Sequence, residues 1–356
     1  MATVSWSTGA EMRVKVLCPE LSEAYDRYLL GQDGSLFYYC SKYKSFLKDL
    51  LKCEEEYLLA VQDGAVHGIC PLMYLKGKAG RVYNSLPYYG SNGGIMADNS
   101  DAYALLASAY RAIAASASTL SSTIISNPLA DQDASAIPFN YADSRVGQFT
   151  SIAFRENQWD EILACVDASA RRNIKKAMRE AIIVERDPSQ LDRLRELHQD
   201  SMASIGGHPK ADEFFRKVPE HFDPGVDYDL YVARLDGAVA AALLVFYFNK
   251  TVEYYTPAVA AEFRSMQPLA LIIITAMAEA ARRGFVWWNW GGTWTSQLGV
   301  YRYKRKWAAI ERKYRYYTQL NDDEILSWSQ SQILSTFPNF FVVPFSALRA
   351  GVTHGQ

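Results

Sequence analysis

Two stretches of the chain share one pattern: residues 58–74 read LLAVQDGAVHGICPLMY, and residues 231–247 read YVARLDGAVAAALLVFY. In each, an Asp-Gly pair separates two apolar runs that are rich in strand-forming residues: Asp63-Gly64 in the first and Asp236-Gly237 in the second. Such a pair between such runs predicts a β-hairpin, because a type I′ turn needs a positive φ at both central residues. The stretches align without a gap, so the sequence predicts the same hairpin twice.

The segments after the two hairpins come in the same predicted order of strand, helix and strand. After the first hairpin they are residues 81–86, 101–118 and 122–126, and after the second they are residues 251–256, 267–283 and 285–290. Strands and helices that alternate in this way indicate an α/β (α+β) fold. We therefore predict two copies of one module, residues 1–152 and 153–320, and a tail, residues 321–356, that packs back on the first module.

Two further helices are predicted at the start of the second module. One covers residues 160–180 and carries a basic face: Arg171, Arg172, Lys175, Lys176 and Arg179. The other begins with Asp187 as the N-cap and Pro188 as the first helical residue. The alternative interpretation of the basic face is an ordinary solvated helix surface.

The composition indicates packed globular domains and excludes several classes of protein. The chain has 356 residues, of which 49% are hydrophobic and 21% are charged, so disorder and coiled coil are excluded as its main organisation. The five cysteines have no spacing suited to a metal or a disulfide framework. We find no signal peptide, and the longest apolar run, residues 268–278, is too short to span a bilayer. We therefore expect a cytoplasmic protein without a bound metal.

The charge of the chain is distributed unevenly. The formal net charge is −2, which argues against a surface that is basic throughout. Residues 167–186 nevertheless carry a net charge of +3 and residues 301–315 one of +6. Nucleophile elbows, Walker loops and Rossmann loops are all missing from the sequence, so the sequence points to no motif-based enzyme class.

The end of the second module contains the remaining unusual features. In residues 301–315, YRYKRKWAAIERKYR, aromatic and basic residues alternate, and a helix followed by a strand would turn Lys304 inward while Arg302 and Arg305 point away. In residues 286–294, VWWNWGGTW, the tryptophans are typical of a strand core. Asn289 and Gly291 are candidates for ligand binding, since a glycine at a strand end lets a ligand approach the backbone closely.

These segments together resemble a known family. The order of ARRNIKKAMREAIIVERD (170–187), a Gly-His-Pro loop (207–209), WNWGG (288–292) and LGVYRYKRKW (298–307) is similar to that in the FemX/FemAB aminoacyltransferases. These proteins form the FemAB-like branch of the GNAT N-acyltransferase superfamily. Residues 82–95, VYNSLPYYGSNGGI, also look like FemAB-like proteins. The resemblance implies two tandem GNAT-like modules, each a mixed, mainly antiparallel sheet flanked by helices, with catalysis in the second.

The resemblance assigns roles to individual residues. The family's aromatic-Lys pair matches Tyr303-Lys304, and its lysine stabilises the charge that develops during acyl transfer. The family's Arg-x-x-x-Tyr, which helps to hold the acceptor, is Lys210-x-x-x-Phe214 here, so the guanidinium and the phenol are both lost. Tyr255 matches a substrate-facing tyrosine of the family, and Lys44 or Lys42 matches its basic residue in the N-terminal helix. The residues assigned to tRNA or phosphate binding are Arg172, Lys175, Lys176 and Arg305.

The sequence also bears on the acyl donor. GNAT enzymes that use acetyl-CoA bind its pyrophosphate with backbone N–H groups in a Q/R-x-x-G-x-G/A turn at a helix N-terminus. Here the turn is residues 264–270, RSMQPLA, where Gln267 and Leu269 replace both glycines and Pro268 has no N–H. Together with the family resemblance, this favours aminoacyl-tRNA over acetyl-CoA as the donor.

We therefore expect an acyltransferase that forms an amide by moving an aminoacyl or acyl group onto an amine of a sugar, peptide or nucleotide-linked precursor. It would bind no cofactor, and its partners would be aminoacyl-tRNA and a small amine-bearing acceptor. The alternatives are an acyl-CoA-dependent GNAT N-acetyltransferase and a non-catalytic binding protein with the same twin-module fold.

Overall fold

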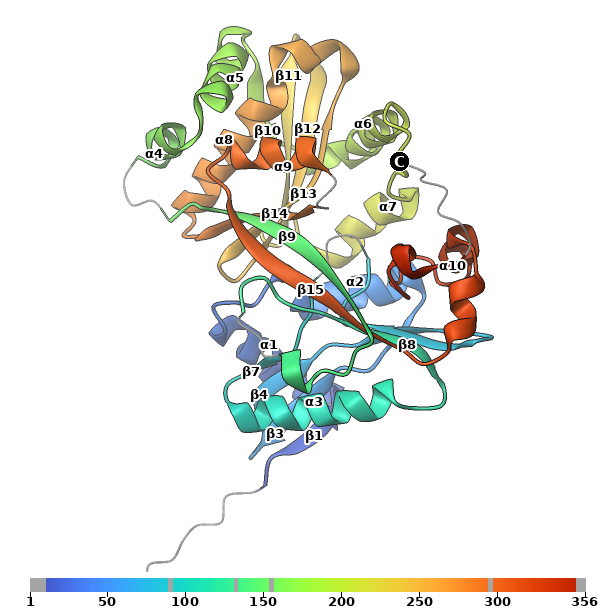
Figure 1. Ribbon diagram of the computed structural model, residues 1–356. Helices are drawn as coiled ribbons and strands as arrows, with labels where there is room; N and C mark the ends of the chain where they lie inside the picture. Colours follow the sequence, from blue (N-terminus) through green and yellow to red (C-terminus); the bar gives the residue numbers. More distant parts are fainter. Residues whose placement is uncertain (1–10, 89–91, 131–133, 154–156, 294–296, 350–356) are drawn as a thin grey trace, which may run out of the picture. The chain divides into compact units, whose positions relative to one another are not determined.

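The computed structural model describes residues 11–88, 92–130, 134–153, 157–293 and 297–349 (Figure 1). Its contacts divide the chain into two compact units, each made of segments that are distant in sequence. Of the described residues, the first unit contains those in the ranges 11–34, 51–144 and 315–349, and the second contains those in the ranges 35–50 and 145–314.

The first unit is a mixed, mainly antiparallel α/β unit. One of its sheets has the order β1-β3-β4-β7, and the other has the order β15-β8-β6-β5-β2, in which β6 and β8 are parallel. Its elements are β1 (Arg13–Val16), α1 (Ser22–Gly31), β2 (Glu54–Glu55), β3 (Leu58–Gln62), β4 (Ala65–Cys70), β5 (Met73–Gly77), β6 (Gly80–Asn84), β7 (Met96–Ala97), α3 (Ser100–Ala114), β8 (Thr119–Ile125) and α10 (Gln330–Thr336). Residues of both units form β9 (Tyr141–Ser151) and β15 (Ile310–Leu320).

The second unit has the strand order β10-β11-β12-β13-β14-β9, in which β13 and β14 are the parallel pair. Its elements are α2 (Ser41–Leu51), α4 (Gln158–Cys165), α5 (Ala168–Arg179), β10 (Ile183–Arg186), α6 (Leu191–Ala203), α7 (Asp212–His221), β11 (Tyr228–Leu235), β12 (Ala238–Phe248), β13 (Thr251–Val259), α8 (Pro268–Arg282), β14 (Trp287–Thr293) and α9 (Leu298–Arg305). Short 3₁₀ helices include η2 (Phe37–Tyr39), η4 (Pro188–Gln190) and η5 (Ala261–Met266).

The two predicted hairpins are confirmed, and they share more than their turns. The φ angles are 50° and 81° at Asp63 and Gly64, and 49° and 82° at Asp236 and Gly237, as a type I′ turn requires. The β3–β4 register shifts after Ala60, and the β11–β12 register shifts after Ala233, which is the aligned position. The α/β fold with two related modules is therefore confirmed.

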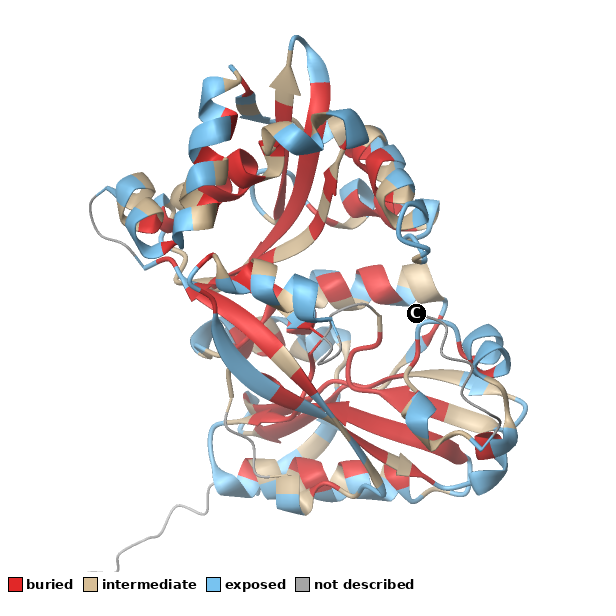
Figure 2. Cartoon of the chain, turned by 45° about the horizontal axis from the view of Figure 1, so that its top comes forward, coloured by how far each residue is buried: buried red, intermediate tan, exposed pale blue. Residues whose placement is uncertain are grey.

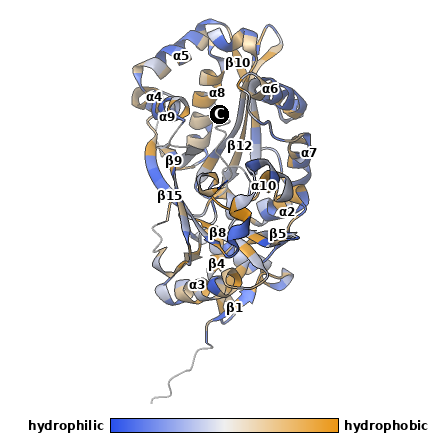
Figure 3. Ribbon diagram, turned by 45° about the vertical axis from the view of Figure 1, so that its right-hand side comes forward, coloured by the Kyte–Doolittle hydropathy of each residue, from blue (hydrophilic) through white to orange (hydrophobic). Residues whose placement is uncertain are grey.

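The core of the second unit lies between its sheet and α8. The helix buries Ile272, Ile273 and Ile274 completely, and it is one of the most apolar helices in Figure 3. α8 packs on β11, β12 and β13 of the sheet, and α4 and α5 pack on α8 in turn. α6 packs on β12 and β13. The central strand β12 is therefore buried on both faces along most of its length, and red predominates in this part of the sheet in Figure 2.

One sequence prediction of a helix is wrong. Residues 160–180 do not form a single helix, because α4 ends at Cys165 and α5 begins at Ala168. Val166 is extended, and the Asp167 carboxylate accepts hydrogen bonds from the N–H groups of Ser169 and Ala170. Asp167 therefore acts as an N-cap, and a cap of this kind starts a new helix. The predicted N-cap Asp187 is confirmed, since it accepts a hydrogen bond from Ser189 N before η4 and α6.

Residues 321–349, which follow β15, pack within the first unit. Phe337 is fully buried against Gly77, where a Cβ would collide with its ring. Asn84 Nδ2 donates to Phe341 O at 2.8 Å, and Ser121 Oγ donates to Val342 O. In the described residues, no helix combines the length and the apolar character needed to cross a bilayer.

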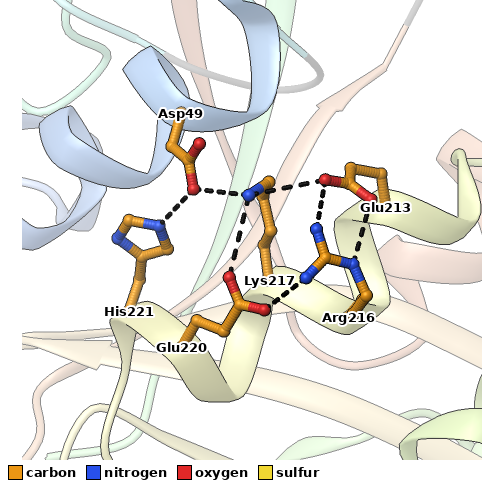
Figure 4. Close-up of polar contacts among 6 residues, drawn as sticks. All are labelled: Asp49, Glu213, Arg216, Lys217, Glu220 and His221. Atoms are coloured by element: carbon orange, nitrogen blue, oxygen red, sulfur yellow. Dashed lines mark hydrogen bonds and ion pairs between the residues drawn. The ribbon is translucent and has the colours of Figure 1, made fainter.

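An ion-pair network ties α2, from the N-terminal part of the chain, to α7 (Figure 4). Lys217 Nζ donates to Asp49 Oδ2 and lies 3.4 Å and 3.7 Å from carboxylate oxygens of Glu213 and Glu220. Asp49, Glu220 and His221 bring potential ligand atoms within 4.8 Å of one another, as a metal site would. The Lys217 ammonium already contacts both carboxylates of this group, so the arrangement is explained by ion pairing.

We expect Lys217→Met to lower the thermal midpoint of unfolding, because it leaves the carboxylates of Asp49, Glu213 and Glu220 close together without the cation between them. The control is Arg193→Met, which removes a more exposed cation of α6 that pairs with Glu196, outside this network. Calorimetry of both variants should show the larger loss for Lys217→Met, and equal losses would contradict this role for the network.

Candidate functional site

The candidate site lies where two parallel strands of the second unit separate. β13 and β14 pair only at Thr251↔Trp287, Val252↔Trp288 and Glu253↔Asn289. Beyond these pairs β13 continues beside β12 as far as Val259, while β14 continues beside β9. The last paired residues, Glu253 and Asn289, therefore stand at the point of divergence, where backbone groups and side chains of both strands become available.

A β-bulge in β13 displaces Tyr255. Leu244 of β12 is opposite Thr256 and the next residue, Val245, is opposite Tyr254, so Tyr255 is the extra residue. Its ring stacks on Phe214 of α7 with the ring centres 5.6 Å apart and the planes inclined by 8°. Lys210 Nζ lies 5.2 Å from the centre of the Tyr255 ring and 5.8 Å from that of Phe214. The structure therefore brings together three residues that the sequence assigned to substrate binding.

Lys210 is held by a histidine that the sequence analysis did not select. The Lys210 backbone N–H donates to His198 Nε2 at 3.1 Å. Burial, with a smaller contribution from Lys210, lowers the pKa of His198 to about 4, so the ring is neutral near pH 7 and can accept this bond. Burial also lowers the pKa of Lys210 to about 8. The only sequence signal for His198 was its position on the apolar face of α6.

The end of β14 contains a second bulge. Asn289 is opposite Phe149, and the next pair is Gly292↔Gly147, so β14 has one residue more than β9 between these pairs. Gly291 has a φ of 73°, which strongly favours glycine, and its N–H donates to Asn289 Oδ1 at 2.8 Å. The bulge therefore explains why this strand end needs both the asparagine and a glycine.

Lys304 of α9 points into this bulge. Its Nζ donates to Thr293 Oγ1 at 2.8 Å and to Gly292 O at 3.1 Å, and it lies 3.4 Å from Gly291 O. The residue is 6% exposed, and burial lowers the pKa of its ammonium to about 8. The prediction that Lys304 points inward while Arg302 and Arg305 are exposed is confirmed. The result is a cation held by neutral oxygen atoms.

Glu253 is a buried carboxyl group at the point of divergence, and the sequence analysis missed it. Its Oε2 accepts hydrogen bonds from Tyr38 Oη at 2.9 Å and from Asn289 Nδ2 at 2.7 Å. Glu253 is 1% exposed, and burial raises its pKa to about 7 against the opposing effect of these two donors. The available signal was a single acidic residue in the otherwise uncharged strand TVEYYTPAV.

A pocket of about 380 Å³ lies at the N-terminal end of α8. Its cationic and polar walls come from four elements or their ends: Asn173, Ser201, Arg264, Gln267, Tyr303 and Lys306. Gln267 has a φ of 62°, a conformation that glycine adopts most easily. The N–H groups of Gln267 and Ala270 bond to Arg264 O and Gln267 O, and Pro268 has none. Few backbone donors are therefore left here to bind a phosphate.

The remaining predicted residues lie on several elements of the second unit. The Tyr303 ring packs edge-on against Trp290, and burial raises its pKa to about 12. Lys44 is half-buried on α2, whose Phe46 ring packs against Phe214 at 5.7 Å, and Lys42 pairs with Asp223 and Asp227. The residues assigned to tRNA are exposed on α5 and α9: Arg172, Lys175, Lys176 and Arg305. Figure 3 shows α5 as mainly hydrophilic.

Comparison with known proteins defines the class of fold first. Residues 168–305 match the family model described as an acetyltransferase (GNAT) domain. The matched residues include β13, β14 and α8, so the strand pair that separates lies within the GNAT domain match. No curated protein sequence matches the chain.

Solved structures are similar in fold to most of the chain. FemX is similar with a TM-score of 0.72 and 14% identity, over 88% of this chain and 98% of FemX. The C-terminal domain of a putative lysylphosphatidylglycerol synthetase from Agrobacterium fabrum has a TM-score of 0.56 and 14% identity, over 90% of this chain and 99% of that domain. A protein of unknown function from Bacteroides thetaiotaomicron has a TM-score of 0.54 and 11% identity, over 87% and 100%. The predicted resemblance to FemX is therefore confirmed at the level of the fold, and the GNAT domain match lies within the second unit.

We expect Thr293→Val to lower the pKa of Lys304 further. The substitution removes the acceptor closest to the ammonium, and a hydrogen bond to a charged group contributes roughly 1.5–3 kcal/mol, or about one to two pKa units. Titration of the lysine side chains by NMR, with Lys304→Met to assign the signal, measures the shift. Thr293→Ser is the control, since it keeps the hydroxyl; an unchanged pKa in Thr293→Val would contradict the proposed contact.

Proposed function

We propose that the protein is an N-acyltransferase of the FemAB-like type, which transfers an aminoacyl or acyl group to an amine. The observation that carries this proposal is the Lys304 ammonium at the point where β13 and β14 diverge, held by Gly292 O and Thr293 Oγ1. In a GNAT fold a cation at this position can stabilise negative charge on a reacting carbonyl group. Lys304 is the proposed catalytic residue.

The proposed chemistry needs no covalent intermediate with the protein. The acceptor amine attacks the carbonyl carbon of the donor ester, a C–N bond forms, and the C–O bond to the donor breaks. The amine loses a proton and the leaving ribose oxygen gains one. Negative charge develops on the carbonyl oxygen, and a positioned cation there lowers the barrier. Because the Lys304 pKa is about 8, the ammonium predominates near neutral pH.

The proposed donor is aminoacyl-tRNA. The turn before α8 offers few backbone N–H groups, since Pro268 has none and those of Gln267 and Ala270 are engaged, which disfavours the usual binding of CoA pyrophosphate. The exposed cations of α5, Arg172, Lys175 and Lys176, can attract the phosphates of an RNA end. The pocket of about 380 Å³ with Arg264 and Lys306 keeps acetyl-CoA as the second candidate.

The proposed acceptor is a small amine-bearing molecule that is a sugar, a peptide or a nucleotide-linked precursor. Lys210 offers one ammonium above the Tyr255 and Phe214 rings, without the planar fork of an arginine. This arrangement suits a single anionic group that approaches over an apolar surface. Lys44, Tyr303 and Gly291 are proposed to contribute to the same binding region.

The competing proposal is a binding protein that keeps the twin-module fold without catalysis. The loss of the family's arginine and tyrosine at Lys210 and Phe214 favours it. The buried Lys304 argues against it, since its ammonium is held by neutral oxygen atoms and burial of a charged group is costly.

The function is tested by supplying purified protein with charged tRNA or acetyl-CoA and a panel of amines, with product detection by mass spectrometry. We expect transfer from charged tRNA, and we expect Lys304→Met to lower kcat by about 10²–10³ because the positioned cation is lost. Turnover with acetyl-CoA alone would overturn the donor assignment, and full activity in Lys304→Met would remove Lys304 from the mechanism.

In the active protein, kcat should fall as the pH rises through about 8, where the Lys304 ammonium deprotonates.

The role of α5 gives a separate prediction. Replacing Arg172, Lys175 and Lys176 by Ala should raise KM for charged tRNA at low salt and reduce the slope of log KM against log salt by about 2, at roughly 0.7 per phosphate contact. The control removes three exposed lysines of the first unit instead: Lys15, Lys76 and Lys78. Equal effects of both triple variants would show a general charge effect and contradict a tRNA site on α5.

A further inference from the structure

Glu253 and Lys304 are connected by a short path of hydrogen bonds. Glu253 Oε2 accepts from Asn289 Nδ2 at 2.7 Å, and Asn289 Oδ1 accepts from Gly291 N at 2.8 Å. The carbonyl groups of Gly291 and Gly292 then lie 3.4 Å and 3.1 Å from Lys304 Nζ. We propose that Glu253 is a positioning residue, which fixes through Asn289 the bulge of β14 that holds the Lys304 ammonium. The consequence for catalysis rests on the function proposed above.

The first step of the argument concerns the orientation of the Asn289 amide. The side chain is 1% exposed, and its nitrogen and its oxygen each have one partner in this path. Glu253 Oε2 acts as an acceptor here, so it requires the Asn289 nitrogen on its own side. The oxygen is thereby directed to Gly291 N. With the amide reversed, two N–H donors would face each other at Gly291, and the bulge would lose its cap.

The second step concerns the bulge. Gly291 has a φ of 73°, and one extra residue of β14 is accommodated between Asn289 and Gly292. A Cβ at Gly292 would collide with the Tyr314 hydroxyl, so the strand end has little freedom to shift sideways. The Asn289 cap therefore determines the direction of the Gly291 and Gly292 carbonyl groups. These carbonyls, with Thr293 Oγ1, are acceptors for a buried ammonium that needs them.

The third step concerns whether Glu253 acts as a hydrogen-bond acceptor or as a negative charge. Tyr38 Oη and Asn289 Nδ2 both donate to the same oxygen, Oε2. The other oxygen, Oε1, is buried and has no hydrogen-bond partner among the described residues. A glutamine at this position could place its carbonyl oxygen where Oε2 is and satisfy both donors. The proposal therefore predicts that position 253 needs an acceptor and not a negative charge.

The test compares Glu253→Leu with Glu253→Gln and measures the titration of Lys304 by NMR together with kcat and KM. We expect Glu253→Leu to lower the Lys304 titration midpoint by about one pH unit and kcat by roughly tenfold with little change in KM. In Glu253→Gln, the Lys304 titration midpoint and kcat should both equal those of the unsubstituted protein. Tyr38→Phe is the matched control, because it removes a hydrogen bond to the same oxygen but lies outside the path, so it should leave the Lys304 midpoint unchanged.

A second variant protects the test if Glu253→Leu does not fold. Asn289→Ala removes both hydrogen bonds of the path without adding volume, and it should shift the Lys304 midpoint in the same direction. Glu253→Gln behaving like Glu253→Leu would overturn the acceptor role, and an unchanged Lys304 midpoint in both Glu253→Leu and Asn289→Ala would overturn the path. Because the Lys304 titration needs no substrate, it decides this inference even if the proposed acyl transfer is not found.

Discussion

The short parallel pairing of β13 and β14 is the constraint on which the candidate site depends. It ends at Glu253 and Asn289, after three pairs, and each strand then continues beside a different neighbour. A sheet that opens in this way exposes backbone carbonyl and N–H groups in its interior. Those groups need partners because unsatisfied buried polar groups are costly. Lys304 and the side chain of Asn289 supply partners on the β14 side, and Glu253 of β13 accepts a hydrogen bond from the Asn289 amide.

The two bulges redirect side chains and carbonyl groups of β13 and β14 beyond the point where the strands separate. In β13 the extra residue is Tyr255, whose ring is redirected onto Phe214 and lies near the Lys210 ammonium. In β14 the extra residue turns the carbonyls of Gly291 and Gly292 toward Lys304. Each bulge thus lies beside a lysine whose pKa is lowered by burial to about 8. Bulges are a common way for a sheet to re-aim a few groups while the rest of its register is kept.

The sequence predicted well those features that depend on neighbouring residues. The Asp-Gly hairpins, the Asp187 cap and the inward direction of Lys304 are local properties, and the structure confirms them. The prediction of one helix over residues 160–180 is wrong because basic and apolar spacing continue across Asp167, while the Asp167 side chain caps the start of a new helix. Glu253 and His198 were missed because their partners, Asn289 and Lys210, are 36 and 12 residues away along the chain.

By itself the sequence determined the repeated module and the segments that form its strands and helices. It also determined the resemblance to FemAB-like proteins, because turn chemistry, periodicity and motif order are written in consecutive residues. Only the tertiary structure decided which side chains meet. Tyr38 lies more than 200 residues from Glu253, yet it donates a hydrogen bond to it in the second unit. The pKa of a buried carboxyl or ammonium group depends on such partners and on burial, and neither exists before the chain folds.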